Sequence, residues 1–437
     1  MVASLDQLEY LLSAPGTNLL ATVSDLDFGS PEASRRAESL RLAYPAEMVA
    51  AAFTLTELRR RASSKFSRAE EMMFTRAGLE QASSEEIARH RSRRFGAVHR
   101  IADLCTGIGG DLLALGDGRA VVAVDRDPLH LKIAAINADV YATGQQVTMR
   151  LEDVRETDLR EVEGVFIDPA RRTDRGRMGR GDSEPPLAWC FSLADRVAAV
   201  GMKAAPGLDH DTVPAGWEIE FVAVGRDLKE AALWSPALAG VARRATILLP
   251  GAVATLVPVP GASVAIAAPG DYLLDPNPAV TRAGLVVDLA CQIGAWQIDE
   301  QIAFLATDVP IETPFARTLR VIDSLPWHLK RLSARLRELE IGTVEIRRRG
   351  LAGDVDEIKR RLKLRGPRRA LLAMTRRQGQ PWCLICEEIM PLAHPSGPVS
   401  IHRSAVSLEI LHEEPCPTPG PDPGEPVEGW TQDSPRG

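Results

Sequence analysis

The stretch Ile101-Ala-Asp-Leu-Cys-Thr-Gly-Ile-Gly-Gly110 decides the fold class of this chain. Its apolar residues predict a buried strand, and the glycines at 107, 109 and 110 predict a tight turn that leads into a helix. A glycine has no Cβ, so a ligand can approach the backbone closely, and the first N–H groups of the following helix are free to bind it. The stretch therefore predicts an α/β fold with a ligand site after its first strand.

Further acidic residues follow the next predicted strands. Asp125 ends the strand Ala120-Val-Val-Ala-Val-Asp125, 22 residues after Asp103, where a Rossmann-type fold places the carboxylate that binds ribose hydroxyls. Asp153 follows a third strand, and Asp168 ends a fourth, Val165-Phe-Ile-Asp168. Because parallel strands of such a fold bind ligands at their carboxyl ends, we expect the four acids to line one edge of a parallel sheet.

Two Rossmann-type families compete for the glycine turn. A dinucleotide-binding fold needs G-x-G-x-x-G/A with a small last residue, but the frame from Gly107 puts Leu112 there. The stretch instead resembles motif I of class I S-adenosylmethionine (SAM) methyltransferases, D-x-G-x-G-x-G, with Asp103, Gly107 and Gly109 in frame and Cys105 replacing the first glycine. This resemblance implies SAM as the cofactor, with both glycines letting the backbone approach it. Another nucleotide-binding fold or a non-catalytic copy are the alternatives.

The resemblance also implies a role for each acid. Asp103 would bind the amino group of SAM, directly or through water. Asp125 would accept hydrogen bonds from the ribose hydroxyls, which suits an acceptor-only carboxylate with two oxygens. Asp153 would accept a hydrogen bond from the adenine N6 amine, with the N–H of Val154 near N1. Each acid could alternatively cap the helix that follows it.

The segment Asp168-Pro169-Ala-Arg171 occupies the place of motif IV. Amino-methylating enzymes of this fold carry D/N/S-P-P-aromatic there, whose oxygens accept hydrogen bonds from the target amine. Here Arg171 replaces the aromatic residue, and its plane could stack on a base or bind phosphate. Methylation at C5 of a pyrimidine needs a cysteine nucleophile, and the strand end at 202–207 has none. We therefore expect Asp168, Pro169 and Arg171 to direct methylation to a ring or exocyclic nitrogen. Lys203 could face the substrate or form a structural ion pair.

The net charge of −7 conceals a strong segregation of charge. From Arg317 to Arg377 the chain has eighteen Lys/Arg and seven Asp/Glu, a local balance of +11. A basic module on an acidic protein suggests a polyanionic partner, and the arginine-rich stretch 171–182 suits a grip on a nucleic-acid backbone. Solvated surfaces would give the same counts. The candidate RNA-binding residues are Arg172, Arg175, Arg347, Arg348 and Arg349.

Two sets of motifs carry a finer resemblance. The first set consists of Lys65-Phe66, Phe74-Thr-Arg76, Gly78-Leu-Glu-Gln81 and Glu85-Glu-Ile-Ala-Arg-His90, and the second of Tyr272-Leu-Leu-Asp-Pro-Asn-Pro278, Ile341-Gly-Thr-Val-Glu-Ile-Arg-Arg-Arg-Gly350 and Leu364-Arg-Gly366. The first set resembles the trimethylguanosine-synthase group of RNA methyltransferases, and the second resembles the THUMP-like domain attached to bacterial relatives of that group. The resemblance implies an RNA substrate, of the tRNA or rRNA kind.

Patterning divides the chain into four parts. Residues 1–97 predict a helical N-terminal extension, and residues 98–256 predict a Rossmann-like SAM methyltransferase core. Strands at 200–204, 218–224 and 245–249 would bring that core to seven strands. Residues 270–411 predict an α+β THUMP-like domain, and residues 412–437 an acidic, Pro-rich disordered tail. Within the core, an apolar stripe (Leu129, Ile133, Ile136, Val140) predicts a packed helix face.

The composition excludes several protein classes. No signal peptide and no apolar run of membrane-span length are present, so we expect a cytoplasmic protein without a membrane partner. Among the six cysteines, the pair at Cys383 and Cys386 has metal spacing, but no second pair or nearby His completes a site. We expect no metal, and the role of this pair and the oligomeric state stay open. The alternatives to an RNA methyltransferase are a SAM enzyme for a small molecule or protein, and a non-catalytic RNA-binding relative.

Overall fold

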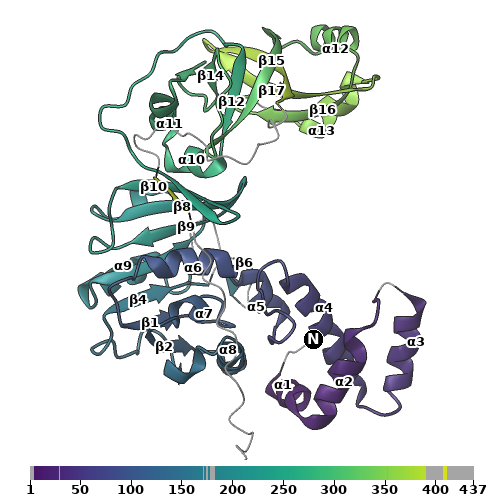
Figure 1. Cartoon of the computed structure of the whole chain (residues 1–437), viewed down its shortest axis with the longest axis vertical. Helices are drawn as coiled ribbons and strands as arrows, with labels where there is room; N and C mark the ends of the chain where they lie inside the picture. The colour runs from purple at the N-terminus through teal and green to yellow at the C-terminus, as the bar shows by residue number, and fades with distance from the viewer. Residues whose placement is uncertain are drawn as a thin grey trace, which may run out of the picture.

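The computed structural model describes residues 4–28, 30–170, 172–173, 176–177, 183–351, 353–389 and 407–410. Figure 1 shows N-terminal helices to one side of a first sheet, with a second sheet and its helices stacked at one end. The first two helices begin at Ser4 and Ser13, whose side chains accept backbone N–H groups of the first turn. The N-terminal helices are α1 (Leu5–Leu12), α2 (Ala14–Ser24), α3 (Pro31–Leu40), α4 (Ala46–Ala62), α5 (Arg76–Gln81) and α6 (Glu85–Arg93).

The first sheet has ten strands in the order β19-β11-β10-β8-β9-β7-β4-β1-β2-β3. From β7 to β3 every neighbouring pair is parallel, which confirms the Rossmann-like core and brings the carboxyl ends of β4, β1, β2 and β3 to one edge. The strands are β1 (Arg100–Leu104), β2 (Ala120–Asp125), β3 (Val147–Leu151), β4 (Gly164–Ile167), β7 (Ala199–Ala204), β8 (Glu218–Val224), β9 (Asp227–Trp234), β10 (Arg243–Leu249), β11 (Ala252–Leu256) and β19 (Ser407–Ile410).

The sheet has more strands than the expected seven, and one of them lies in an unexpected place. We expected residues 245–249 to supply the seventh strand, but β9 takes that place, antiparallel between β7 and β8. Strands β10, β11 and β19 then extend the same edge. β9 begins with Asp227-Leu-Lys-Glu230, and we predicted no strand there because nothing in the sequence shows that Glu230 is buried. Pairing with β11 also places residues 407–410 in the first sheet, although we expected them in the C-terminal unit.

Helix α8 (Pro128–Val140) joins the N-terminal helices to the first sheet. Asp127 caps it, accepting from the N–H groups of Leu129 and His130. Its apolar stripe packs in one core with the N-terminal helices, whereas Ala134 and Ala138 pack in the core against the sheet. The stripe is therefore core, as expected, and it fixes the N-terminal helices in place. The remaining short elements of this unit are α7 (Leu112–Leu115), α9 (Leu187–Ser192), β5 (Arg172–Thr173) and β6 (Gly176–Arg177).

Helix α6 packs on the first sheet through charged side chains. Arg94 donates to the buried Glu218 of β8 (2.9 Å), and the ring Nε2 of His90 lies 2.7 Å from Oε1 of Glu220. Glu220 also accepts from the indole N–H of Trp234 (2.9 Å). Buried carboxylates are tolerated only when they are paired and hydrogen-bonded, and these conditions are met on both glutamates.

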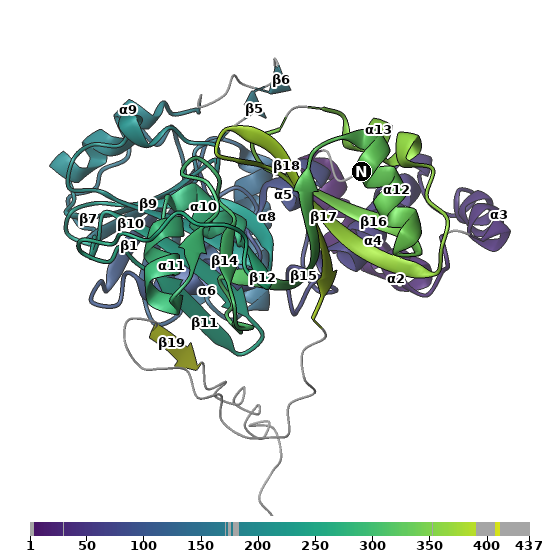
Figure 2. The same cartoon turned by 90° about the horizontal axis from the view of Figure 1, so that it is seen from above.

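The second sheet has the order β13-β14-β12-β15-β18-β17-β16. Its α+β architecture agrees with the expectation for the C-terminal unit. The strands are β12 (Tyr272–Pro276), β13 (Trp296–Gln297), β14 (Leu305–Thr307), β15 (Ala316–Pro326), β16 (Ile341–Arg348), β17 (Arg368–Arg377) and β18 (Gln380–Glu388), and the helices are α10 (Pro278–Ala283), α11 (Val286–Ile293), α12 (Leu329–Glu338) and α13 (Val355–Leu362). Figure 2 shows α12 and α13 on one face of this sheet.

A buried acid joins the second unit to the first sheet. Asp275 of β12 is 2% exposed. Its Oδ2 pairs with Arg226 in the β8–β9 turn (3.0 Å) and its Oδ1 with Arg349 after β16 (2.8 Å). Asn277 donates to the carbonyl of Gly225 in the same turn (2.8 Å). The motif Tyr272-Leu-Leu-Asp-Pro-Asn-Pro278 therefore anchors the second unit to the first sheet.

Candidate active site

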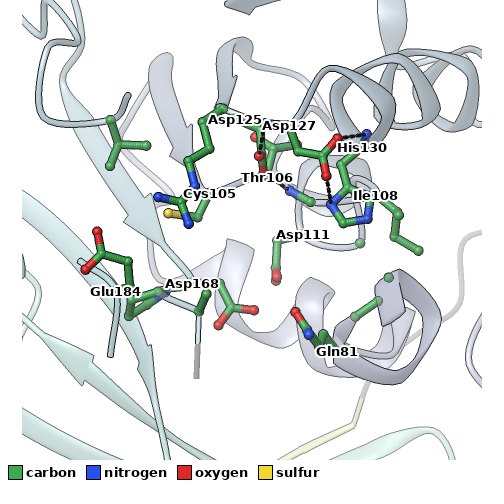
Figure 3. A pocket seen from close by; sticks show the side chains of 18 of the residues that line it. Gln81, Cys105, Thr106, Ile108, Asp111, Asp125, Asp127, His130, Asp168 and Glu184 are labelled. Carbon is green, nitrogen blue, oxygen red and sulfur yellow. Dashed lines mark hydrogen bonds and ion pairs between the residues drawn. The ribbon is translucent and has the colours of Figure 1, made fainter. Parts of the chain in front are cut away.

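A cavity of about 640 Å³ opens at the carboxyl ends of β1, β2 and β4. Figure 3 shows Asp125 and Asp127 on one side of it, and Asp111, Asp168 and Gln81 on the other. The loops after the strands form most of the wall, and α5 of the N-terminal extension supplies the rest, including Gly78 and Gln81. This volume lies within the usual range of small-molecule sites.

The glycine turn leaves space on the cavity side. Gly107 has φ +57°, and a Cβ built on it would meet nothing within 4 Å. Gly109 does not line the cavity: a Cβ there would lie 3.2 Å from Cα of Ala134, so this glycine allows α8 to pack closely. Cys105, in place of the first motif glycine, has φ +62°. Because that left-handed conformation favours glycine, it explains why the motif has a glycine at this position.

Asp125 is held with its carboxylate facing the cavity. Its Oδ2 accepts from the N–H of Gly107 (2.7 Å), and its Oδ1 accepts from the N–H of Asp127 (2.9 Å). An ionised carboxylate has about four lone-pair sites, so each oxygen keeps one for a ligand. The pair of oxygens is suited to bind two neighbouring hydroxyls, as expected for a ribose.

Asp103 lies behind the cavity wall rather than in it. It is 1% exposed, and its Oδ2 has no hydrogen-bond partner among the described residues. Burial, followed by the neighbouring Asp111 carboxylate, raises the pKa of Asp103 well above its usual range. A buried carboxylate oxygen without a partner is costly, and a cationic group such as the amino group of SAM would remove that cost.

Asp153 and Val154 both line the cavity after β3. Oxygens of Asp153 accept from the backbone N–H and the guanidinium of Arg155 (2.9 and 3.0 Å). Arg155 in turn pairs with Glu184 on the neighbouring wall. The Asp153 carboxylate is thus partly occupied, with its side chain 34% exposed, and it keeps room for one more donor.

Asp168 and Pro169 lie at the end of β4 and line the cavity. Oδ2 of Asp168 accepts from the ammonium of Lys203 on β7 (2.7 Å). Its Oδ1 has no partner among the described residues. Of the other residues expected at this edge, Arg171 and Arg175 lie outside the described residues, and for Arg172 only the backbone is described.

A buried ionic network lies beneath this edge. The guanidinium of Arg91 on α6, 1% exposed, binds both oxygens of Glu230 on β9 (2.9 and 3.1 Å). It also pairs with Asp111 and donates to the hydroxyl of Ser83 (2.5 Å), and it stacks on the ring of Phe166. Burial favours the neutral form of Arg91, but its carboxylate neighbours outweigh that effect and raise its pKa. The network fixes the N-terminal extension to the edge of the sheet that carries Asp168.

The residues expected to bind RNA differ in how free they are. Arg348 is exposed and pairs with no described acid. Arg347 is 47% exposed and pairs with Glu345 (2.9 Å). Arg349 is bound to Asp275 and stacks on a phenylalanine ring, so it helps to anchor the second unit to the first sheet. Sequence reasoning could not separate the three, because the acid that holds Arg349 lies 74 residues away.

A more accessible set of basic residues lies on α12 and α13 and directly after α13. The apolar faces of these helices are packed in one core, and the hydroxyl of Ser333 donates to the carbonyl of Leu362 (2.9 Å), which holds the helices together. The basic residues are therefore left on the outside. The basic helix pair is defined by the exposed side chains Lys330 and Arg331 of α12, Lys359 of α13, and Lys363 and Arg365 after α13.

The described residues hold no cluster of three or more His, Cys, Asp or Glu that could bind a metal. Cys383 and Cys386 of β18 are fully buried in the second unit, and burial raises the pKa of the Cys383 thiol to about 12. They therefore serve as packing residues. Among the described helices, none has the length and apolarity needed to cross a bilayer.

The cavity suits SAM, a molecule with a sulfonium and an ammonium group. Gly107 leaves space for SAM to approach the backbone. The oxygens of Asp125 can accept hydrogen bonds from its ribose, and the unpartnered oxygen of Asp103 can accept one from its ammonium. The sequence did not indicate the wall formed by α5, and it left the role of Lys203 open. The helical pattern expected of residues 1–97 carries no sign of where α5 docks.

Comparisons with known proteins agree with this geometry. The chain is 38% identical over 338 residues to an uncharacterized S-adenosylmethionine-dependent methyltransferase of Mycobacterium tuberculosis, known from strains CDC 1551 / Oshkosh and H37Rv, and the match covers 74% of this chain and 91% of the relative. A crystal structure from Porphyromonas gingivalis W83, assigned as a methyltransferase, matches with a TM-score of 0.65 at 18% identity, over 86% of this chain and 97% of the other. Residues 316–388 match a family model described as THUMP domain-like. Residues 4–62 match a domain of unknown function (DUF8688).

Proposed function

Because this chain belongs to the S-adenosylmethionine-dependent methyltransferases, we propose that it uses SAM to methylate a nitrogen of an RNA base. SAM supplies an electrophilic methyl group on a sulfonium. The observation that carries the proposal is the position of Asp168, which lines the cavity at the end of β4 with one oxygen free of described partners. That oxygen can accept a hydrogen bond from an N–H group of the nitrogen that is to be methylated.

Each candidate site residue takes a role in this proposal. Asp103 would bind the ammonium of SAM from behind the cavity wall, directly or through water. Asp125 would bind the ribose hydroxyls, and Asp153 with Val154 the adenine. Asp168 and Pro169 would contact the acceptor, and so would Arg171, which lies outside the described residues. The resemblance to the trimethylguanosine-synthase group favours a base nitrogen as acceptor, although no Phe, Tyr or Trp lines the cavity within the described chain. Stacking of the base would therefore rely on Arg171 or on another group.

The second unit supports RNA as the substrate. Its THUMP-like match spans 316–388, and this segment contains the basic helix pair. Phosphate contacts would come from these five side chains, from Arg347 and Arg348, and from Arg172 and Arg175 beside motif IV. Arg349 would act indirectly, because its ion pair with Asp275 helps to hold the second unit against the first sheet.

The direct test is transfer of labelled methyl groups from SAM to total RNA from a strain that lacks the gene. We expect the RNA to take up label, and Asp168→Ala to stop turnover while SAM affinity stays within a few-fold, because Asp168 faces the acceptor. Label in a protein or small-molecule fraction, with none in RNA, would contradict the RNA proposal.

RNA binding provides a second test. For single-stranded RNA the log–log salt slope changes by roughly 0.7 per phosphate contact, so replacing Lys330, Arg331, Lys359 and Lys363 by Ala should lower it by about three units if all four touch phosphates. A matched control replaces Arg160, which is 88% exposed and paired with Asp158. An equal slope in the fourfold variant and the control would exclude the basic helix pair as the RNA surface.

A further inference from the structure

We infer that the atom methylated at this site carries a hydrogen that leaves as a proton, and that Lys203 is the positioning residue that enforces this preference. The inference rests on the proposed function and narrows it. It includes methyl acceptors such as exocyclic amines and ring N–H groups, and it excludes ring nitrogens that have only a lone pair.

The ammonium of Lys203 is fixed at the catalytic edge. Its side chain is 6% exposed, and its three hydrogens match three acceptors: Oδ2 of Asp168 (2.7 Å), the carbonyl of Gln81 (3.2 Å) and the hydroxyl of Ser83 (3.2 Å). An ammonium offers three donors, so every donor is used. Lys203 therefore holds one oxygen of Asp168 and leaves Oδ1 for the acceptor.

A second layer keeps Lys203 in place. The Ser83 hydroxyl that it contacts also accepts from Arg91 (2.5 Å) and donates to Asp111 (3.4 Å). Arg91 is bound to Glu230 on its other side. A rotation of the ammonium away from Asp168 would thus leave buried polar groups without partners, which is costly.

The fixed carboxylate favours a methyl acceptor that carries a hydrogen. An ionised carboxylate oxygen only accepts hydrogen bonds, so an N–H group can donate to Oδ1 of Asp168. A ring nitrogen that has only a lone pair would instead face this oxygen lone pair to lone pair. Lys203 holds the carboxylate in this orientation through Oδ2.

A proton-bearing acceptor can use this contact and then lose its proton. The acceptor nitrogen forms its bond to the methyl carbon, and the carbon–sulfur bond breaks with its electron pair left on sulfur. The electron pair of the N–H bond stays on nitrogen, and the proton passes to Asp168 and then to water. The methylated base ends neutral.

Mass spectrometry of nucleosides decides the acceptor class. RNA is compared from a wild-type strain, a strain without the gene and the complemented strain. Loss of a neutral methylnucleoside, such as one methylated on an exocyclic amine or at N1 of guanine, is expected. Loss of a cationic one, such as a base methylated at N1 of adenine or N7 of guanine, would overturn the inference and leave the proposed function standing.

Two other outcomes are also informative. A methyl group lost from a ribose hydroxyl would keep the inference, because a hydroxyl also sheds a proton, and would overturn the base nitrogen of the proposed function. An unchanged set of RNA nucleosides would overturn the proposed function and this inference with it.

Variants of Lys203 test its role in the methyl-transfer assay on RNA from the strain without the gene. Lys203→Met should lower kcat about 100-fold, as for loss of a preorganised charge, with the Kd of SAM within a few-fold by calorimetry. Lys203→Arg, which retains the cation, should restore most of kcat. Lys229→Met is the matched control, because Lys229 is exposed on β9 and pairs with Asp227.

Thermal melting of each variant separates misfolding from a catalytic defect. If Lys203→Met melts early, Lys203→Arg and Lys203→Gln take its place, since they differ in charge and keep a donor. Equal kcat in the arginine and glutamine variants would overturn the role of Lys203. So would a loss that appears only in KM.

Discussion

Asp125→Ala should weaken cofactor binding by a large and predictable factor. Asp125 offers one lone pair on each oxygen to the ribose hydroxyls, because the N–H groups of Gly107 and Asp127 occupy the others. Each hydrogen bond to a charged group contributes about 1.5–3 kcal/mol. Taking the lower figure for a carboxylate that is only partly buried, the loss is about 3 kcal/mol, or about 150-fold in Kd.

Calorimetry with two ligands isolates the ribose contribution. SAM and 5′-methylthioadenosine share adenine and ribose, but the latter lacks the amino acid portion. Asp125→Ala should weaken both by the same factor, whereas Asp103→Asn should weaken SAM alone, because Asp103 is matched to the ammonium. Asp158→Ala, at an exposed ion pair with Arg160, is the control.

The result that refutes this reasoning is specific. A Kd for 5′-methylthioadenosine within about threefold of wild type in Asp125→Ala would show that the carboxylate does not bind the ribose. A loss seen for SAM but absent for 5′-methylthioadenosine would assign Asp125 to the amino acid portion instead. Release of the Gly107 N–H is part of the expected loss, and Asp125→Asn would keep one acceptor and show a smaller effect.

Three further variants test features of the fold. Cys105→Gly should raise the free energy of unfolding by about 1 kcal/mol, since glycine adopts the left-handed conformation freely, as thermal melting would show. Arg91→Met should destabilise the protein by about 3–5 kcal/mol in chemical denaturation, because it strands buried carboxylates, whereas Arg160→Met should change little. Burial opposes ionisation of Glu220, but His90 and other donors outweigh it and hold the pKa of Glu220 below its usual range. Its contribution is therefore complete above the pKa of an unfolded glutamate, about 4.3, and is lost as the pH falls. A Glu220→Gln variant should show a shallower fall of melting temperature in acid, and an equal fall in both proteins would contradict the assignment.

The catalytic edge of the sheet could be predicted from the sequence because its signals are local. The glycine turn, the strand that ends at Asp125 and the cap at Asp127 each depend on residues within a few positions of one another. The backbone hydrogen bonds of Asp125 follow directly from that local geometry. Their expected ligand roles are matched to the cavity and await the binding tests above.

The buried charges could not be predicted, because their partners are distant in sequence. The sequence of helix α6 gives no sign that its arginines are buried, yet Arg91 contacts Glu230, 139 residues away, and Arg94 contacts Glu218, 124 residues away. Periodicity assigns charged positions to the surface, so it also hid the strand that contains Glu230. The same limit made Arg349 look like an RNA contact.

The charged packing of α6 has a consequence for how this protein can be divided. When an apolar helix is removed from a sheet, it leaves a hydrophobic surface, which detergent or a new partner can cover. Removal of α6 would instead leave Glu230 without Arg91, and Glu218 and Glu220 without Arg94 and His90. Glu218 would keep Arg244, but the loss of partners from these buried carboxylates would act against the strands that carry them. A fragment that starts at β1 should therefore fail to assemble its own sheet, which makes the N-terminal helices part of the folding unit of the catalytic core.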